Sequence, residues 1–384
     1  MKRWALTTIA LLVLGGTGTA AADDSLAGLI QTGHREEALK LIRAGTDVNA
    51  TQGDGTTPLH WAVYRVDAEL SRELLQHGAN ADVVNAYGSS PLAEAVKIGD
   101  AELTKMLLDA GARADSKNED GMTALMLASR SGALDVAKLL VEHGADVNAK
   151  EEWRGQTALM WAVDSNYPDV ADFLIARGAD VHVRAMANDW DAQITSEPRA
   201  QYRPTGGMTP LLYAARSGCT RCVAAILEAG AAIDRPTPDG VTPLMIAIDN
   251  LRFDTAKLLL ERGANPHVWD WWGRTALYIA VDMSTYNFRR TPPKAKDSSA
   301  TTAIDIVRLL LSAGVNPNPQ LDMHRPGRGS NSGRFVDDLL TTGATPLLRA
   351  AIGHDTEAVQ ALLEHGALVE LPCLRALPQP ARRP

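Results

Sequence analysis

Cys219 and Cys222 form a CxxC sequence in a chain of 384 residues that holds three cysteines. Helical spacing would bring their sulfurs within reach of one another, and export would favour oxidation. Redox catalysis would need a lowered thiol pKa, which a helix N-terminus can supply. However, no thioredoxin-like pattern surrounds the pair, and Val223 stands where a c-type haem site needs His. A single CxxC also lacks the second ligand pair of a tetrahedral metal site. We therefore expect a local disulfide or two unreactive thiols, and no metal.

The remaining residues that could do chemistry form no catalytic motif. The chain has no nucleophile elbow, phosphate loop, HExxH helix or paired-carboxylate pocket. The nine histidines are scattered, and three of them precede equivalent glycines, where a His suits the C-terminal end of a helix: His77, His143 and His365. We therefore expect a protein that is not an enzyme and needs no cofactor.

Aromatic side chains are few but gathered, and they are the best candidates for binding. Exposed Trp and Tyr are common anchors of interfaces, and VWDWWG at 268–273 is hard to explain as solvent-facing decoration. The alternative is that these rings pack against neighbouring turns and stiffen the chain. The predicted contact residues are Trp61, Trp161 and Tyr213 on helices, and Trp153, Trp190, Trp269, Trp271 and Trp272 in connecting segments.

The elements that hold these residues come from a phrase that occurs eight times: Thr or Ser, Pro or Ala, Leu, two variable residues and Ala. The copies begin at residues 57, 90, 123, 157, 209, 242, 275 and 345. In seven of them a Gly follows the first residue by 21 positions, and the copy at 275 reaches Gly314 after 18 extra residues. The commonest step is 33 residues, which predicts an array of short helical repeats.

Each repeat is predicted to hold two antiparallel helices. In the first copy Thr57 suits an N-cap, and Pro58 fits the first helical position. Helix A should end at about Val66. Helix B should span about 68–76, and Gly78 supplies the left-handed residue that ends it. Such a pair cannot bury its apolar face alone, so each repeat needs neighbours on both sides.

The phrase TPLHWA, the Gly-Ala after helix B and GADVNA at 144–149 resemble the ankyrin repeat family over roughly residues 24–371. The resemblance implies an all-α solenoid of about nine helix-turn-helix repeats with three loop insertions. A capping repeat would span 23–53, and further repeats would start near 54, 87, 120, 154, 206, 239, 272 and 342. The family's His within the phrase survives only as His60, so its usual polar bridge between repeats is not expected elsewhere.

Comparison of the copies separates packing positions from variable ones. The third residue is always Leu and the sixth always Ala, so both should be core. The fifth residue varies, and the presence of Glu and Arg there predicts that it reaches water. Its occupants are Trp61, Glu94, Leu127, Trp161, Tyr213, Ile246, Ile279 and Arg349.

Three insertions account for the irregular steps. One adds 19 residues between Arg184 and Gly207, one adds 18 between the two helices of a repeat around 284–302, and one adds 19 around 319–338. The resemblance implies that the first and third project toward the concave, ligand-binding face. The first carries Trp190 and Tyr202, so a binding role stands against simple tolerance of a long surface loop.

The N-terminal segment has the pattern of a secretory signal peptide of bacterial style. Lys2 and Arg3 precede an apolar run and a small-residue site, which predicts cleavage after Ala22 and a periplasmic or secreted protein. No later segment is long and apolar enough for a membrane span. Loss of the leader takes the formal charge from −8 to −10, which disfavours nucleic acid as a partner. We expect a monomer.

The C-terminal tail, residues 372–384, is irregular. The period predicts another cap near residue 378, and none occurs there. We therefore expect the end of the array to be truncated or frame-shifted.

By resemblance, the predicted function is non-catalytic: a protein–protein interaction scaffold that binds a protein or peptide through the concave groove and the inter-repeat turns. Two alternatives stay open. One is an exported effector acting on a host protein. The other is an enzyme or enzyme accessory, either with the first insertion as an active-site lid or as a helper to an exported redox enzyme.

Overall fold

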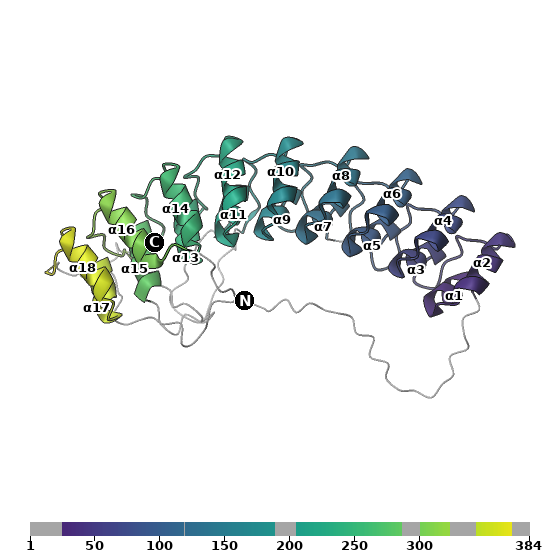
Figure 1. Cartoon of the computed structure of the whole chain (residues 1–384), viewed down its shortest axis with the longest axis horizontal. Helices are drawn as coiled ribbons and strands as arrows, with labels where there is room; N and C mark the ends of the chain where they lie inside the picture. The colour runs from purple at the N-terminus through teal and green to yellow at the C-terminus, as the bar shows by residue number, and fades with distance from the viewer. Residues whose placement is uncertain (1–24, 119, 189–204, 286–299, 323–342, 371–384) are drawn as a thin grey trace, which may run out of the picture.

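The computed structural model describes residues 25–118, 120–188, 205–285, 300–322 and 343–370. The predicted signal peptide (1–22), the tail (372–384) and most of each insertion lie outside these residues. Over the described residues the chain forms nine antiparallel helix pairs and one short strand pair (Figure 1), so the predicted all-α solenoid is confirmed. The elements are α1 (Leu26–Thr32), α2 (Arg35–Arg43), α3 (Pro58–Tyr64), α4 (Ala68–Gln76), α5 (Pro91–Ile98), α6 (Ala101–Asp109), α7 (Ala124–Ser131), α8 (Leu134–Glu142), α9 (Ala158–Asp164), α10 (Pro168–Ala176), β1 (Ala187–Asn188), β2 (Thr205–Gly206), α11 (Pro210–Ser217), α12 (Thr220–Glu228), α13 (Pro243–Asp249), α14 (Phe253–Glu261), α15 (Ala276–Thr285), α16 (Ala303–Ser312), α17 (Pro346–Ile352) and α18 (Thr356–Glu364).

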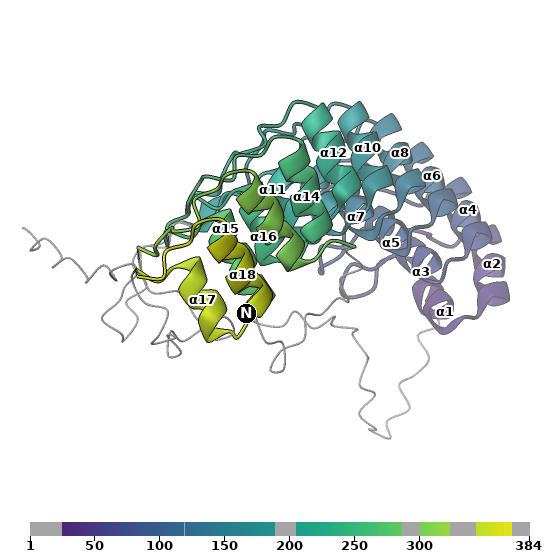
Figure 2. The ribbon, with the colours of Figure 1, turned by 60° about the vertical axis from the view of Figure 1, so that its left-hand side comes forward.

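The helices form two curved rows. Odd-numbered helices make the inner row of the arc and even-numbered helices the outer row (Figure 1). Figure 2 shows the turns between pairs gathered along one side of the array. Across the described residues, helices pack extensively only within their own pair or against the adjacent pair. The array is therefore held by nearest-neighbour contacts, as expected for a solenoid.

The repeated Thr or Ser starts each inner helix by capping it. The Thr57 hydroxyl accepts a hydrogen bond from the His60 N–H, and Thr275 accepts one from the Tyr278 N–H at 3.2 Å. The same cap is built at Ser90, Thr123, Thr157, Thr209, Thr242 and Thr345. Loss of one such cap typically costs about 1 kcal/mol. Helix α3 ends two residues earlier than predicted, and Val66 has φ 57°, a left-handed value that is incompatible with a continued helix.

The invariant apolar positions build one continuous core. The eight alanines of the phrase are fully buried: Ala62, Ala95, Ala128, Ala162, Ala214, Ala247, Ala280 and Ala350. The leucine position is buried in seven copies, but Leu347 in α17 is only partly buried. Among the described helices, the last pair packs against a neighbour on one side only, which accords with the partial exposure of Leu347.

Side-chain amides connect the turns of adjacent repeats. Asn49 donates to the Gly78 carbonyl at 2.9 Å and accepts from the Asn80 N–H at 2.7 Å. After the third insertion, Asn318 donates in the same way to the Gly366 carbonyl at 3.2 Å. The ninth pair therefore docks like the others, although the chain between it and the eighth pair is much longer.

His60 makes the polar bridge that the sequence retains at this one copy of the phrase. Its Nδ1 accepts from the Thr57 N–H at 3.2 Å, so Nε2 carries the proton and donates to the Ser89 carbonyl at 3.0 Å. Burial lowers the pKa of His60 below its ordinary value, although the Ser89 carbonyl opposes the shift. In the next repeat but one, Met126 occupies this position and is fully buried. Apolar packing there replaces the bridge.

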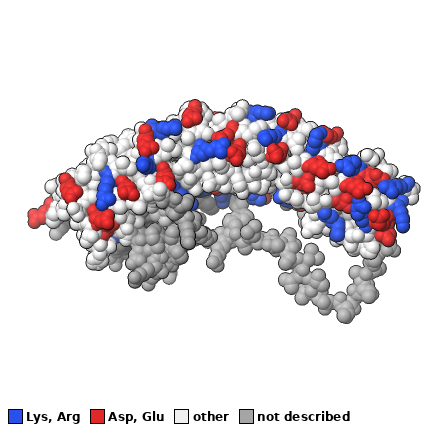
Figure 3. Space-filling model, viewed as in Figure 1, with Lys and Arg blue, Asp and Glu red and all other residues white. Residues whose placement is uncertain are grey.

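The outer row carries charges of both signs, which are interspersed along the array (Figure 3). Several ion pairs cross from one repeat to the next, among them Arg43–Glu73 at 2.9 Å and Arg308–Glu357 at 3.2 Å. Three of these four side chains are more than half exposed, so each pair contributes at most about 1 kcal/mol to stability.

Strands β1 and β2 stand at the base of the first insertion, where Ala187 pairs with Gly206. Beside them, Arg184 donates to the Gly207 carbonyl at 2.7 Å and to the Pro236 carbonyl at 2.8 Å. The turn at the base of the insertion is therefore hydrogen-bonded to the turn of the next repeat.

Candidate protein-binding surface

The fifth position of the phrase is more buried than the sequence predicts. Its occupants divide evenly: Leu127, Tyr213, Ile279 and Arg349 are buried, and Trp61, Glu94, Trp161 and Ile246 are partly buried. The expectation that this position reaches water is therefore wrong for the four buried copies and holds only in part for the other four. The inner row packs closely enough to cover most of each side chain.

Arg349 shows how a charge is accommodated there. Its Nε lies 2.6 Å from Asp282 Oδ1 on α15, and the two side chains are only 9% and 3% exposed. Next to this pair, Arg274 bonds Asp270 at 2.7 Å. The Arg in this phrase is therefore part of the junction between the eighth and ninth pairs and cannot be taken as a sign of exposure.

The tryptophans of the turns differ in exposure. Trp153 is 62% exposed, Trp269 68% and Trp271 45%, whereas Trp272 is 2% exposed. The expectation that Trp272 is a surface anchor is wrong, because its ring is core. Its carbonyl accepts a hydrogen bond from the Asp322 N–H at 3.2 Å, so the turn of the following repeat lies against it.

Asp270 explains why the adjacent residues Trp271 and Trp272 differ in exposure. It is 3% exposed, and its carboxylate accepts from the Trp272 and Arg274 N–H groups at 3.0 and 2.9 Å. The turn is thus wound around a buried carboxylate, with Trp271 outward and Trp272 inward.

Two of the predicted contact residues, Trp153 and Trp161, line the same cavity of about 340 Å³. It lies between the turns that lead into α7 and α9. We name this cavity the Trp153–Trp161 pocket. Its walls also include Asp120, Met122, Arg130, Glu151, Arg154 and Gln156. A cavity of this size suits a single large side chain or a small ligand.

Two arginines of this pocket stack on its two tryptophans. The Arg130 guanidinium lies 5.6 Å from the centre of the Trp161 ring, and that of Arg154 lies 5.2 Å from Trp153. Such cation–π contacts are worth about 0.5–1 kcal/mol at exposed sites. They also hold the guanidinium planes in place, which leaves their N–H edges directed to other partners.

Glu151 is the buried carboxylate of the pocket. It is 5% exposed, and its oxygens accept from the N–H groups of Trp153, Arg154 and Gln156 at 2.7, 2.7 and 3.1 Å. Its negative charge is therefore used to shape the turn.

Tyr213 extends the same surface onto α11. Its hydroxyl receives a hydrogen bond from Gln156 Nε2 at 2.8 Å, and Arg216 lies 4.8 Å from its ring centre. Arg216 also pairs with Asp164 at 2.7 Å. Burial raises the pKa of Tyr213, which keeps the phenol neutral.

The other predicted contact residues lie apart from this group. Trp61 is partly buried on α3, where its indole N–H donates to Gln52 Oε1 at 2.8 Å and its ring meets Tyr64 edge-on. Trp269 and Trp271 belong to the turn before α15. Trp190 lies outside the described residues.

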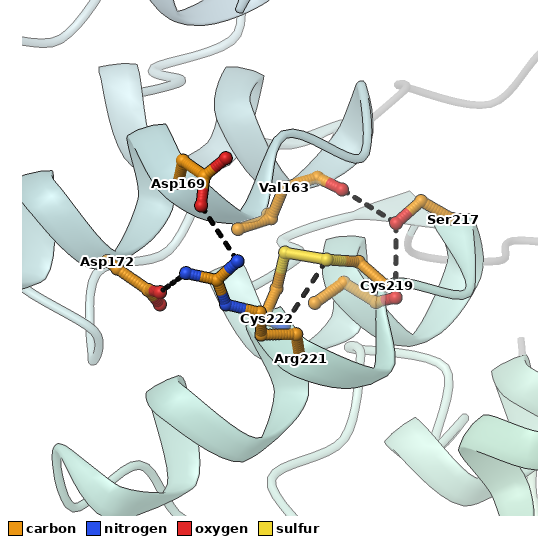
Figure 4. Close-up of a disulfide and its surroundings, with 8 residues drawn as sticks. Val163, Asp169, Asp172, Ser217, Cys219, Arg221 and Cys222 are labelled. Atoms are coloured by element: carbon orange, nitrogen blue, oxygen red, sulfur yellow. Dashed lines mark hydrogen bonds and ion pairs between the residues drawn. A yellow bond between two sulfur atoms is a disulfide. The ribbon is translucent and has the colours of Figure 1, made fainter. Parts of the chain in front are cut away.

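The cysteines form a local disulfide, shown in Figure 4. Cys219 is the N-cap of α12 and accepts from the Cys222 N–H, and both residues are buried, at 3% and 0% exposure. Arg221 beside them pairs with Asp169 and Asp172 of α10. Because the sulfurs are shielded from attack by another thiol, the bond fits a structural role.

The described residues contain no group of three or more His, Cys, Asp or Glu side chains that could hold a metal ion. None of the described helices is both long and apolar enough to cross a bilayer.

Sequence reasoning missed Arg130, Arg154 and Gln156. A usable signal was present for the first, because Arg130 and Arg216 both follow the start of their phrase by seven residues. Nothing in the pattern marks Arg154 or Gln156, since each is special only through the ring that it meets.

Comparison with known proteins agrees with this architecture. A family model described as Ankyrin repeats (3 copies) matches residues 26–118, 93–185 and 190–270, and one described as Ankyrin repeat matches 342–373. These matches cover more than half of the chain. Among solved structures, the crystal structure of the human ASB11 ankyrin repeat domain is similar, with a TM-score of 0.50 and 23% identity over 63% of this chain and 98% of that chain. At that identity the likeness concerns the fold alone.

Proposed function

Because the chain belongs to the ankyrin repeat family, whose members are generally scaffolds for protein–protein interaction, we propose that it binds a protein or peptide segment without catalysing a reaction. The contact surface is the inner row and the turns of the central repeats. The observation that carries the proposal is the Trp153–Trp161 pocket, where rings and guanidinium groups line one cavity in the turns. Aromatic and Arg side chains are the residue types most enriched among interface hot spots.

The exposed turn residues Trp269 and Trp271 form a second contact area on the same side of the array. Large exposed apolar side chains are costly to leave in water and commonly mark interaction sites. Trp272 is excluded from the proposed surface because it is buried.

The test compares capture of partners from an extract of the producing cell. We expect Trp153→Ala combined with Trp271→Ala to abolish specific capture while far-UV circular dichroism stays unchanged. Tyr64→Ala is the matched control, because Tyr64 is 63% exposed at the end of α3, at the opposite end of the helix from the turn. Equal capture by the double variant and the control would refute the proposed surface.

We place the protein outside the cytoplasm, in a periplasm or secreted. The leader at 1–22 and the local disulfide support this location. Cell fractionation tests it, and also separates a periplasmic scaffold from an effector delivered to a host cell. The buried disulfide disfavours the alternative of a redox accessory, since thiol–disulfide exchange needs an accessible sulfur.

A further inference from the structure

The Trp153–Trp161 pocket holds two arginines and one indole N–H that pair with none of its own carboxylates. Arg130 and Arg154 are both exposed and each stacks on a tryptophan. Within the described part of the chain, neither has a carboxylate at ion-pair distance. Two guanidinium groups, each held over an aromatic ring, therefore line the pocket without an ion pair to a described carboxylate.

Arg216 shows what such an arginine does when an anion is present. It occupies the same place in its repeat as Arg130 and stacks on Tyr213 at 4.8 Å. Unlike Arg130, it also pairs with a carboxylate, that of Asp164, at 2.7 Å. Stacking through the face and pairing through the edge are compatible, so a carboxylate can join Arg130 without disturbing its contact with Trp161.

The indole N–H of Trp161 supplies a second unmatched donor. Its Nε1 atom is buried and has no hydrogen-bond acceptor among the described residues. At the matching position, Trp61 donates from Nε1 to Gln52 in its own turn at 2.8 Å. Glu152 stands in the place of Gln52, but its side chain is 73% exposed and lies 3.9 Å from Lys117. A buried N–H without an acceptor is costly, so this position favours a ligand that accepts a hydrogen bond.

The carboxylates of the pocket do not meet this demand. Glu151 is committed to three backbone N–H groups of its own turn. Asp120 is exposed and forms no ion pair with either arginine in the described structure. No described carboxylate of the pocket therefore pairs with Arg130 or Arg154 or accepts from Trp161 Nε1.

We propose that the Trp153–Trp161 pocket binds the carboxylate side chain of a Glu or Asp residue in a partner peptide. This inference rests on the proposed function. The carboxylate accepts from the Arg130 and Arg154 edges and from Trp161 Nε1, and the methylene groups of the acidic residue contact the rings. The cavity of about 340 Å³ accommodates one side chain, and exposed Trp153 at its edge contacts the residues that flank it.

The probe is a phage-displayed library of random dodecapeptides, selected on the full chain. We expect the selected sequences to share one acidic position. A synthetic selected peptide and its twin with that acid replaced by its amide are then compared by fluorescence anisotropy. The amide twin should bind at least about tenfold more weakly, because a charge-assisted bond is lost.

Variants of the chain locate the acid. Arg130→Gln and Trp161→Phe should each weaken the acidic peptide several-fold, and with Arg130→Gln the two twins should bind within about twofold of each other. Trp61→Phe is the matched comparison, since it removes an indole N–H whose acceptor lies in the protein, and it should weaken the acidic peptide less than Trp161→Phe does. Circular dichroism confirms that each variant is folded.

Different failures are distinguishable. Selected peptides with no shared acid, or twins that bind equally, overturn the carboxylate inference and leave the scaffold function standing. The same holds if Trp161→Phe and Trp61→Phe have equal effects. Recovery of no peptide by the wild-type chain counts against the proposed function itself.

Discussion

Replacement of Arg349 by Met should release the ninth helix pair from the array. Arg349 and Asp282 are 9% and 3% exposed and lie 2.6 Å apart, so the change leaves a carboxylate buried beside an apolar side chain. Breaking a buried ion pair in this way typically costs about 3–5 kcal/mol. Among the described helices, α17 and α18 pack on one neighbouring pair only. The lost free energy should therefore make it easier for this ninth pair to open while the rest of the array stays folded.

Hydrogen exchange followed by mass spectrometry measures this opening directly. Protection of amides in α17 and α18 should fall by about 10²-fold or more, the change that about 3 kcal/mol implies, while protection in α7 to α12 stays constant. Replacement of both Arg349 and Asp282 by apolar residues of similar volume should restore most of the protection, because both charges of the buried pair are then removed together.

The control variant acts on the same two repeats. Arg308 and Glu357 join α16 to α18 at 3.2 Å, but their side chains are 55% and 66% exposed. Arg308→Met should therefore change protection by about fivefold or less. If Arg349→Met leaves the exchange of α17 and α18 unaltered, or if both variants act equally, burial does not govern the strength of these pairs and the reasoning fails.

Three further outcomes are expected. Trp272→Ala should lower the free energy of unfolding by about 3–5 kcal/mol in urea melts, whereas Trp271→Ala, at an exposed position, should lower it by less than about 1 kcal/mol; similar losses would contradict the inward placement of the first ring. Alkylation of the purified protein should label one cysteine before reduction and three afterwards, and the Cys219→Ser, Cys222→Ala variant should lose less than about 2 kcal/mol, because Ser is itself a good N-cap for α12. Because burial lowers the pKa of His60, the unfolded chain binds a proton at this residue at a higher pH than the folded chain does, so His60 contributes stability that is present above its ordinary pKa of 6.5 and is lost as the pH falls through 6.5 toward the folded value. His60→Gln should therefore flatten the change in the free energy of unfolding between pH 7 and pH 5. An unchanged slope would argue against burial as the cause.

The scaffold could be predicted from the sequence because its causes are local and repeated. A cap such as Thr57 acts on an N–H three residues away. At Ala62 and its equivalents, the side chain is fully buried and the adjacent helix leaves no room for a larger one. Each of these positions is sampled eight times in the chain, so the constraint is visible without any structure.

The candidate site could be predicted only in part, because each of its side chains is placed by a contact that occurs once in the chain, in some cases with a residue far away in the sequence. Trp271 and Trp272 are adjacent and chemically identical, and the buried carboxylate of Asp270 decides which of them faces inward. Arg349 is buried because Asp282 lies 67 residues before it on the facing helix. No spacing rule within one repeat contains that information.

The nearest-neighbour packing of the helix pairs also determines how the protein tolerates damage. A proteolytic nick or a mechanical pull at the C-terminal end can remove α17 and α18 without disturbing α7 and α9, since the described helices pack extensively only within a pair or between adjacent pairs. The protein can therefore lose a terminal helix pair and keep the proposed binding surface of the central repeats intact. In the proposed location outside the cytoplasm, loss of terminal helix pairs to proteases would leave shortened forms that keep the central repeats.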